Sequence, residues 1–211
     1  RSKDDDGNTH GPSGRRCKRE LGIPEDKAQE NFTDPQSRIM KTPEGFQQCY
    51  NGQAAVDEGS MLIVAADLSN NAPDNGQLLP MVEQTQANTG MAPQMTLADA
   101  GYASEATFAE LEQRQLAASV ALGRKDKKQR TIDPQRHPAT NRMALWLKTA
   151  EGQEHYRRRK TIPEPVFGWI KQAVGFRRFS MRGLEAAKAE WHLICAAVNL
   201  KRMHSLGWSP A

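Results

Sequence analysis

Residues 93–123, PQMTLADAGYASEATFAELEQRQLAASVALG, combine the patterns of a strand, a helix and a second strand. Residues 93–99 and 117–123 are short apolar runs that predict strands. Between them, residues 104–115 have the spacing of a helix, and Ser104 is its expected N-cap. A strand, a helix and a strand in this order are typical of an α/β fold.

The sequence upstream continues this alternation of strands and helices. Residues 46–57 and 60–69 predict two strands, and residues 74–88 predict a helix with Asp74 near its start. Together with the elements of residues 93–123, they predict a mixed α/β sheet with helices packed on it.

Three further helices are expected downstream, over residues 141–150, 163–172 and 183–203. In the last of them, six side chains fall on one face, which predicts that they belong to the core. These six are Leu184, Ala187, Trp191, Ile194, Cys195 and Val198.

Composition and charge describe a polar, mildly basic chain. It has 211 residues, 37% of them hydrophobic and 26% charged, with a net charge of +4 and a pI near 9.0. Its longest strongly apolar run, WHLICAAV, is too short to cross a bilayer, so no membrane partner is expected. The three cysteines, Cys17, Cys49 and Cys195, lack zinc spacing and predict free thiols in a reducing cytoplasm.

The chain is expected to fold into one domain after a flexible arm. Residues 1–35 are charged, rich in glycine and almost free of large apolar side chains, so they predict an arm or linker. Residues 36–205 form the expected folded domain, and residues 206–211 a tail. Because the sequence does not begin with methionine, it is expected to be the later part of a longer protein.

Three carboxylates stand at positions where a site could form. Asp57 closes the first predicted strand, Asp99 closes the strand of residues 93–99, and Glu164 opens a helix beside a basic cluster. Strand ends are where active sites are built in α/β sheets, so neighbouring strands would bring the two aspartates together. Three converging carboxylates repel one another unless a cation lies between them, and hard divalent ions such as Mg²⁺ or Mn²⁺ prefer oxygen ligands.

Each carboxylate also has a simpler structural explanation. A single aspartate at a strand end usually forms a turn, and Asp67 and Asp74 are rivals in similar positions. Asp74 is expected to cap its helix instead. Thr161 and Glu164 match a capping box, in which the glutamate would turn back to the Thr161 amide and away from a metal. The residue pattern leaves these alternatives open.

Three blocks of the sequence resemble a known family. They are DPQSRIMKTPEGFQQCYNGQAAVDEGSMLIVAADLSNNAPDNGQLLPMVE (34–83), LADAGY (97–102) and the segment that begins YRRRKTIPEPVFGWIKQ (156–172). Over residues 32–203, the chain is similar to the catalytic domain of DDE transposases of bacterial insertion sequences.

The third block resembles the Tyr-Arg-Glu-Lys signature of that family, with Tyr156, Arg159, Glu164 and Lys171 in the matching places. The gap before Glu164 is one residue longer than the usual pattern, so either Arg159 or Lys160 fills the arginine position.

The resemblance implies a ribonuclease H-like fold, a mixed β-sheet flanked by helices. It implies that Asp57, Asp99 and Glu164 form a catalytic triad that binds Mg²⁺ or Mn²⁺. Family members hydrolyse DNA at the ends of the mobile element and join the freed 3′-hydroxyl to target DNA. The resemblance also implies a homodimer on paired DNA ends, in the bacterial cytoplasm and associated with the nucleoid when bound to DNA. Residues 1–35 show no helix-turn-helix pattern for recognising the element ends.

Basic residues around Glu164 are the candidates for binding DNA. Glu164 and Lys171 are seven apart and share one helix face, and Gly168 between them would let a DNA backbone approach. Tyr156 would stack on a base or donate to a phosphate. The remaining candidates for contacting phosphates are Arg158, Arg159, Lys160, Arg177 and Arg178. The alternative for such basic runs is a solvated surface.

The leading hypothesis is a metal-dependent transposase domain that cuts and joins DNA. One rival is a non-catalytic DNA-binding remnant, which would keep the basic surface without cutting. Another is a metal-dependent endonuclease of the same fold that performs no strand transfer. The intact set of three carboxylates argues against the remnant.

Overall fold

The structure is a computed structural model that describes residues 2–3, 9–10, 31–42, 44–123, 132–159 and 161–208. The chain divides into two units, residues 1–32 and 33–211. In the first unit, strand β1 (Ser2–Lys3) pairs antiparallel with β2 (Thr9–His10). The predicted arm lies mostly outside the described residues.

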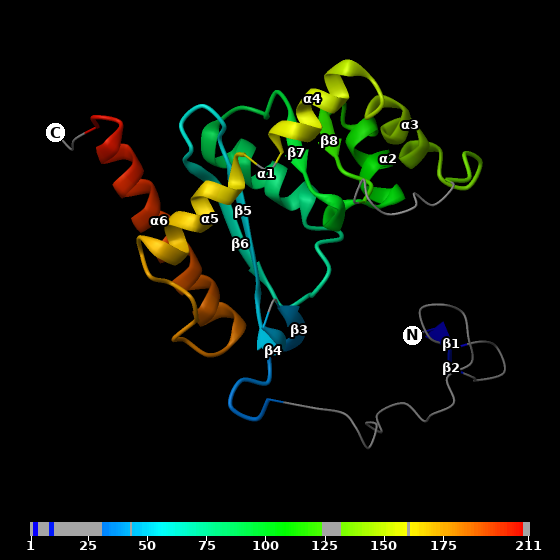
Figure 1. Cartoon of the computed structure of the whole chain (residues 1–211). Helices are drawn as coiled ribbons and strands as arrows, with labels where there is room; N and C mark the ends of the chain where they lie inside the picture. Colours follow the sequence, from blue (N-terminus) through cyan, green and yellow to red (C-terminus); the bar gives the residue numbers. More distant parts are fainter. Residues whose placement is uncertain are drawn as a thin grey trace. The chain divides into compact units, whose positions relative to one another are not determined.

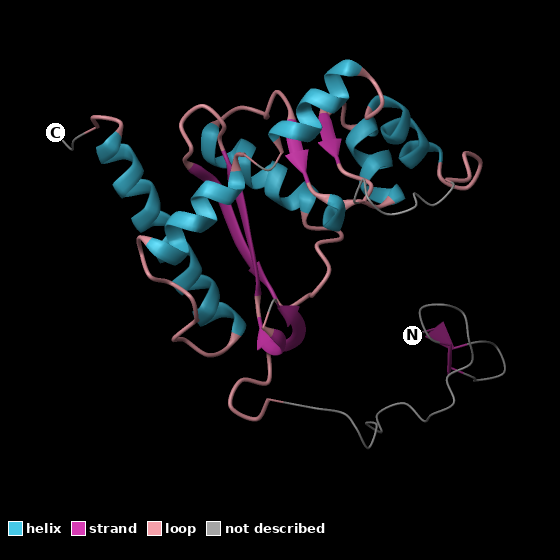
Figure 2. Ribbon diagram, in the orientation of Figure 1, coloured by secondary structure: helices cyan, strands magenta, loops and turns pink. Residues whose placement is uncertain are grey.

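The second unit contains the predicted alternation of strands and helices (Figures 1 and 2). Its strands are β3 (Arg38–Thr42), β4 (Gly45–Cys49), β5 (Asn51–Val56), β6 (Ile63–Ser69), β7 (Thr96–Ala98) and β8 (Ala118–Val120). Its helices are α1 (Leu78–Thr89), α2 (Glu105–Gln113), α3 (Pro138–Trp146), α4 (Ala150–Arg158), α5 (Pro163–Gln172) and α6 (Leu184–Ser205), with a 3₁₀ helix η1 (Ala100–Tyr102).

Within the described residues, hydrogen bonds join the strands only in pairs. β3 with β4 and β5 with β6 are antiparallel ladders, whereas β7 and β8 are parallel. The α/β class and the strand, helix and strand order of β7, α2 and β8 are therefore confirmed. A single continuous mixed sheet is not what the structure shows, because no ladder connects the β5–β6 pair to the β7–β8 pair.

The prediction of one strand over residues 46–57 was wrong, because the chain changes partner at Tyr50. β4 pairs with β3 before this residue, and β5 pairs with β6 after it. The Tyr50 hydroxyl donates to the Asp34 carboxylate at 2.7 Å, and its ring packs edge-on against Phe179. These long-range contacts fix the break, and the local sequence does not reveal them.

One hydrophobic core lies between the β5–β6 hairpin and helices α5 and α6 (Figure 1). Trp191 is 4% exposed at its centre, and its indole Nε1 donates to the main-chain oxygen of Gln53 at 3.0 Å. The predicted apolar stripe of α6 is confirmed. Four of its members are buried, namely Ala187, Trp191, Cys195 and Val198. The other two, Leu184 and Ile194, are partly buried and pack against this core.

A second core joins α1, β7, α2, β8 and α3. Its centre holds Phe108 and Val120, which are 2% and 0% exposed. The hydroxyl of Ser104 accepts a hydrogen bond from the Thr107 amide at 3.1 Å, so the predicted N-cap of α2 is confirmed. The unit is thus organised around two clusters of buried side chains, and α1 contributes to the second.

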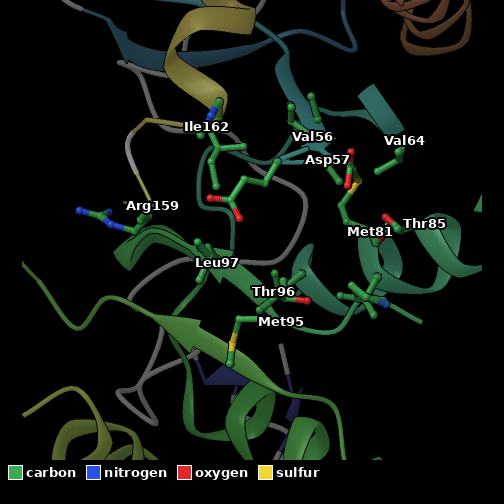
Figure 3. Close-up of a pocket in the computed structure, with 18 of the residues that line it drawn as sticks. Val56, Asp57, Val64, Met81, Thr85, Met95, Thr96, Leu97, Arg159 and Ile162 are labelled. Carbon is green, nitrogen blue, oxygen red and sulfur yellow. Dashed lines mark hydrogen bonds between the residues drawn. The ribbon is translucent and has the colours of Figure 1, made fainter. Parts of the chain in front are cut away.

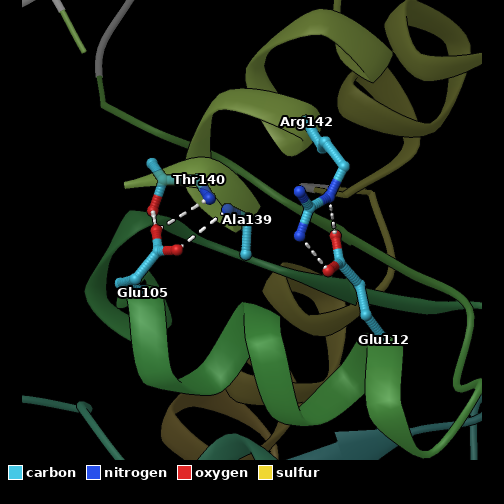
Figure 4. A network of polar contacts seen from close by, with 5 residues as sticks. All are labelled: Glu105, Glu112, Ala139, Thr140 and Arg142. Carbon is cyan, nitrogen blue, oxygen red and sulfur yellow. Dashed lines mark hydrogen bonds and ion pairs between the residues drawn. The ribbon is translucent and has the colours of Figure 1, made fainter. Parts of the chain in front are cut away.

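A carboxylate from α2 holds the start of α3 (Figure 4). The Glu105 carboxylate accepts hydrogen bonds from the amides of Ala139 and Thr140, at 2.8 and 2.9 Å, and from the Thr140 hydroxyl at 2.6 Å. A negative charge at a helix N-terminus is favourable, because the first amides of a helix lack partners within it. Nearby, Arg142 of α3 pairs with Glu112 of α2.

We expect Glu105→Gln to lower the Tm at neutral pH. The difference in Tm between the native and variant chains should become smaller at acidic pH. Burial raises the pKa of Glu105, but the hydrogen bonds from Thr140 and Ala139 outweigh it and leave the pKa below its ordinary value. Because the folded pKa is the lower one, the stabilisation is complete above the ordinary value of about 4.3 and is lost as pH falls through the folded pKa. Thermal unfolding of the native and variant chains from pH 7 to pH 3 measures this.

Glu44→Gln is the matched control, because Glu44 lies exposed in the turn between β3 and β4. We expect it to leave the Tm almost unchanged across the same pH range. If the decrease in Tm caused by Glu105→Gln is the same from pH 7 to pH 3, the charged Glu105 carboxylate does not stabilise the start of α3.

Two expectations from composition can be compared with the described residues. Cys49 and Cys195 carry free thiols, as predicted, while Cys17 lies outside the described residues. No helix in the described part of the chain is long and apolar enough to span a membrane.

Candidate active site

A cavity of about 1250 Å³ opens in the second unit, with walls drawn from both cores. Figure 3 shows part of its lining, which includes Thr96 and Leu97 of β7 and Met81 and Thr85 of α1. The predicted carboxylates Asp57, Asp99 and Glu164 all line this cavity. They reach it from the end of β5, the end of β7 and the start of α5.

Asp57 follows β5 directly and closes the turn to β6. Its carboxylate accepts hydrogen bonds from the Ser60 hydroxyl at 2.6 Å and the Ser60 amide at 2.8 Å. These hydrogen bonds hold the pKa of Asp57 below its ordinary value. The side chain is exposed and is therefore an ionised carboxylate at neutral pH.

Asp99 caps a turn and lines the cavity at the same time. Its Oδ1 accepts a hydrogen bond from the Gly101 amide at 2.8 Å, which makes it the N-cap of η1. The simple turn-forming explanation is therefore correct, and it does not remove Asp99 from the cavity wall. A side chain at Gly101 would overlap the carboxylate of Asp74 and come within 3.1 Å of Asp99 Oδ1, so a larger residue here would displace these carboxylates.

Glu164 stands in the first turn of α5, and the capping box suggested by its sequence does not form. The N-cap of α5 is Ile162, with no side-chain hydrogen bond. The Thr161 hydroxyl instead donates to the main-chain oxygen of Arg158 at 2.8 Å. Glu164 is exposed and is not turned back onto the backbone.

The rival aspartates are used elsewhere, and neither lines the cavity. Asp67 forms an ion pair with Lys188 of α6. The prediction that Asp74 caps α1 was wrong, because the N-cap is Gln77. The Asp74 carboxylate accepts hydrogen bonds from the side chains of Asn51 and Gln53 on β5.

The described residues contain no group of three or more His, Cys, Asp or Glu side chains close enough to hold a metal ion. The three carboxylates share a cavity without converging to one point. Their chemistry nevertheless fits a hard divalent cation, since all three are oxygen donors on the wall of a water-accessible space.

Three of the predicted DNA-binding residues, Arg158, Arg159 and Lys171, line the same cavity. Arg158 makes a two-point ion pair with Glu58, with its Nε 2.8 Å from Oε1. The Arg159 guanidinium lies over the Tyr156 ring, 4.8 Å from its centroid. Its Nε is buried and lacks a hydrogen-bond partner among the described residues.

Among the described residues, the predicted DNA-binding residues Tyr156, Arg177 and Arg178 do not line the cavity. Arg177 and Arg178 are exposed in the segment after α5, where Arg177 donates to Gln172 at 3.1 Å. Tyr156 lies beside the Arg159 guanidinium. Lys160 lies outside the described residues, so the structure does not choose between it and Arg159 for the arginine of the signature.

Sequence reasoning missed a polar group behind the cavity. Gln53 on β5 is 2% exposed, and its side-chain oxygen accepts a hydrogen bond from the Tyr102 hydroxyl. Burial, followed by the charges of Asp74 and Asp99, raises the pKa of Tyr102, so this hydroxyl stays protonated. A glutamine inside the apolar strand pattern was the available signal, because a buried amide needs partners.

The family model of the transposase DDE domain matches residues 16–200, which is most of the chain. The chain therefore belongs to the DDE transposase family, and its function class is that of a transposase, an enzyme class whose substrate is DNA. No curated protein sequence matches the chain. No solved structure matches it either.

Proposed function

We propose that this chain is the catalytic domain of a bacterial insertion-sequence transposase, which cuts DNA at the element ends and joins the freed 3′-hydroxyl to target DNA. Asp57, Asp99 and Glu164 are its catalytic residues. The proposal includes a homodimer on paired DNA ends in the bacterial cytoplasm, associated with the nucleoid when DNA is bound. Membership of the DDE transposase family supports the class of reaction.

One observation carries the assignment of the site. Asp57, Asp99 and Glu164 are far apart in the sequence and belong to three different elements, yet they line one cavity. The competing carboxylates Asp67 and Asp74 are held in other contacts outside it. An aspartate that only forms a turn has no need to line a cavity. The presence of these three carboxylates in the cavity, and the absence of Asp67 and Asp74 from it, therefore favours a shared functional role for the three.

The three carboxylates would hold Mg²⁺ or Mn²⁺. Such ions lower the pKa of a bound water or hydroxyl and stabilise the leaving oxygen of a phosphodiester. Asp57 is suited to this role because the Ser60 hydrogen bonds keep it ionised. Glu164 is suited to it because α5 leaves its carboxylate exposed.

The basic residues of the cavity would hold the DNA backbone. Arg159 and Lys171 line the same cavity as Glu164, so a phosphate bound by them would lie in the cavity that contains the carboxylates. A Cβ added at Gly168 meets nothing within 4 Å, so the space above α5 is open to a ligand. Neutralising phosphates makes the affinity fall as salt rises.

Incubation with supercoiled plasmid and Mn²⁺ tests the reaction directly. We expect the native chain to nick the plasmid and to join a duplex oligonucleotide with a free 3′-hydroxyl to it. Nicking without joining would indicate an endonuclease that performs no strand transfer. DNA binding without nicking, in Mg²⁺ or Mn²⁺, would contradict the proposal and indicate a non-catalytic remnant.

Metal binding gives a prediction that needs no DNA. We expect Mn²⁺ or Mg²⁺ to raise the Tm of the native chain as its concentration passes the dissociation constant, because the ion binds only the folded state. At 100 times that constant the gain is about 2.7 kcal/mol. Asp57→Asn should remove the rise.

Asp67→Asn is the matched control, since it neutralises an aspartate on β6 that lies outside the cavity. It should keep the metal-dependent rise in Tm. If native chain and Asp57→Asn respond equally to millimolar metal, the carboxylates are not the binding site.

A further inference from the structure

A buried polar bridge connects the two cores behind the cavity. Gln53 sits on β5 at its centre, and its side-chain oxygen accepts from the Tyr102 hydroxyl of η1. Its Nε2 donates to Asp74 Oδ1 at 2.8 Å, and its main-chain oxygen accepts from the Trp191 indole at 3.0 Å. Both polar atoms of the Gln53 side chain are therefore used within the protein.

The bridge starts on the strand that carries Asp57. Gln53 lies on β5 four residues before Asp57, which follows the strand directly. Ala54 and Val56 of the same strand pack into the core formed with α5 and α6. Gln53 is therefore part of the strand that leads directly to the first carboxylate of the cavity.

The bridge ends in the turn that carries Asp99. Tyr102 is the last residue of η1, the short helix that Asp99 caps. The Asp74 carboxylate lies against Gly101 in the middle of this turn, and it is held there by Asn51 Nδ2 at 2.7 Å and by Gln53. β5 thus contacts the turn directly through Gln53, and indirectly through Asp74, which Asn51 and Gln53 hold.

The turn has few other attachments to β5. β7, which leads into it, has only three residues and pairs with β8, not with the β5–β6 hairpin. No ladder between the two strand pairs of the cavity sets the separation of Asp57 and Asp99. In the described structure, the packing of α1 against β5, β6 and the second core connects the two pairs, together with these side-chain hydrogen bonds.

We propose that Gln53 and Tyr102 are positioning residues that hold the turn carrying Asp99 against the strand carrying Asp57. Gln53 is buried, and Tyr102 lines the cavity but its hydroxyl is bound to Gln53, so both side chains are assigned positioning roles. The effect on catalysis rests on the function proposed above, whereas the effect on the turn does not. Asp74 assists by filling the space that Gly101 leaves.

Tyr102→Phe tests this by removing one hydroxyl and keeping the ring. Tyr50→Phe is the matched control, because Tyr50 also donates its hydroxyl to a buried side chain, Asp34, and neither residue lines the cavity. Both variants should fold and lose similar amounts of stability. Backbone order parameters from NMR relaxation, measured for Asp99–Ala103, report on the turn without any metal or DNA.

We expect Tyr102→Phe to lower the order parameters of the turn from about 0.85 to below about 0.6, and Tyr50→Phe to leave them unchanged. The second readout is the Mn²⁺ concentration that gives half-maximal plasmid nicking. It should rise about tenfold or more in Tyr102→Phe alone, as is typical when a residue that orients a metal ligand is lost. A residue that only stabilises the fold would not change this concentration.

Two results would overturn the inference. One is a turn that stays ordered in Tyr102→Phe, and the other is a loosened turn with an unchanged Mn²⁺ requirement. Failure of the proposed function is distinguishable, since the native chain would then nick no DNA at any metal concentration. In that case, the order parameters alone decide whether Gln53 and Tyr102 hold the turn.

Discussion

Asp99→Asn should reduce metal-dependent DNA nicking by at least about 10²-fold while the chain stays folded. Loss of a residue that merely orients a metal ligand typically costs 10–100-fold, so loss of the ligand itself should cost at least as much. Asparagine keeps an oxygen that can accept the hydrogen bond from the Gly101 amide, so the cap of η1 is preserved. The loss therefore reports on the charge of Asp99 and not on the turn.

Plasmid nicking rates in Mn²⁺, together with the Tm of each variant, measure this effect. Asp67→Asn is the control, because its carboxylate pairs with Lys188 away from the cavity. It should keep most of the activity. An Asp99→Asn chain that nicks within a few-fold of the native rate would show that Asp99 serves only as a turn former.

Trp191→Ala should produce the largest loss of stability, about 3–5 kcal/mol in the free energy of unfolding. The indole is 4% exposed, stacks near Phe167 with ring centroids 6.2 Å apart, and lies against Gly52 of β5. The substitution leaves a void in the first core. It also leaves the main-chain oxygen of Gln53 without its indole donor.

Urea unfolding of the native and variant chains measures this loss. Trp208→Ala is the matched control, because Trp208 is 48% exposed and a surface substitution usually changes stability by less than about 0.5 kcal/mol. Equal losses in the two variants would mean that the first core does not depend on α6. Trp191→Phe should fall between them, since it keeps an aromatic ring but removes the indole donor.

Elements with strong local signals were predicted well. The helix over residues 163–172 has the predicted bounds, and Ser104 caps α2 as expected. The stripe along α6 is buried as its spacing predicted. In each case the decisive interactions join residues that are close in sequence, or depend on which face of one helix is apolar.

Elements that depend on distant partners were predicted less well. The strand over residues 46–57 is divided because Tyr50 contacts Asp34 and Phe179. The capping box at Glu164 has the right residue types, yet the Thr161 hydroxyl bonds to the preceding helix instead. Where a local hydrogen bond competes with tertiary contacts, the residue types do not indicate which one forms.

The candidate site also combines features that the sequence predicted with features that only the tertiary structure determined. The amino-acid sequence by itself identified the family motifs, Asp57, Asp99 and Glu164 as candidate carboxylates, and the helix on which Glu164 stands. Only the tertiary structure placed them on one cavity, sent Asp67 and Asp74 to other contacts, and connected Gln53 to Tyr102, 49 residues away. The physical reason is that burial and hydrogen bonding between distant segments depend on how the two cores pack, and no local pattern encodes that arrangement.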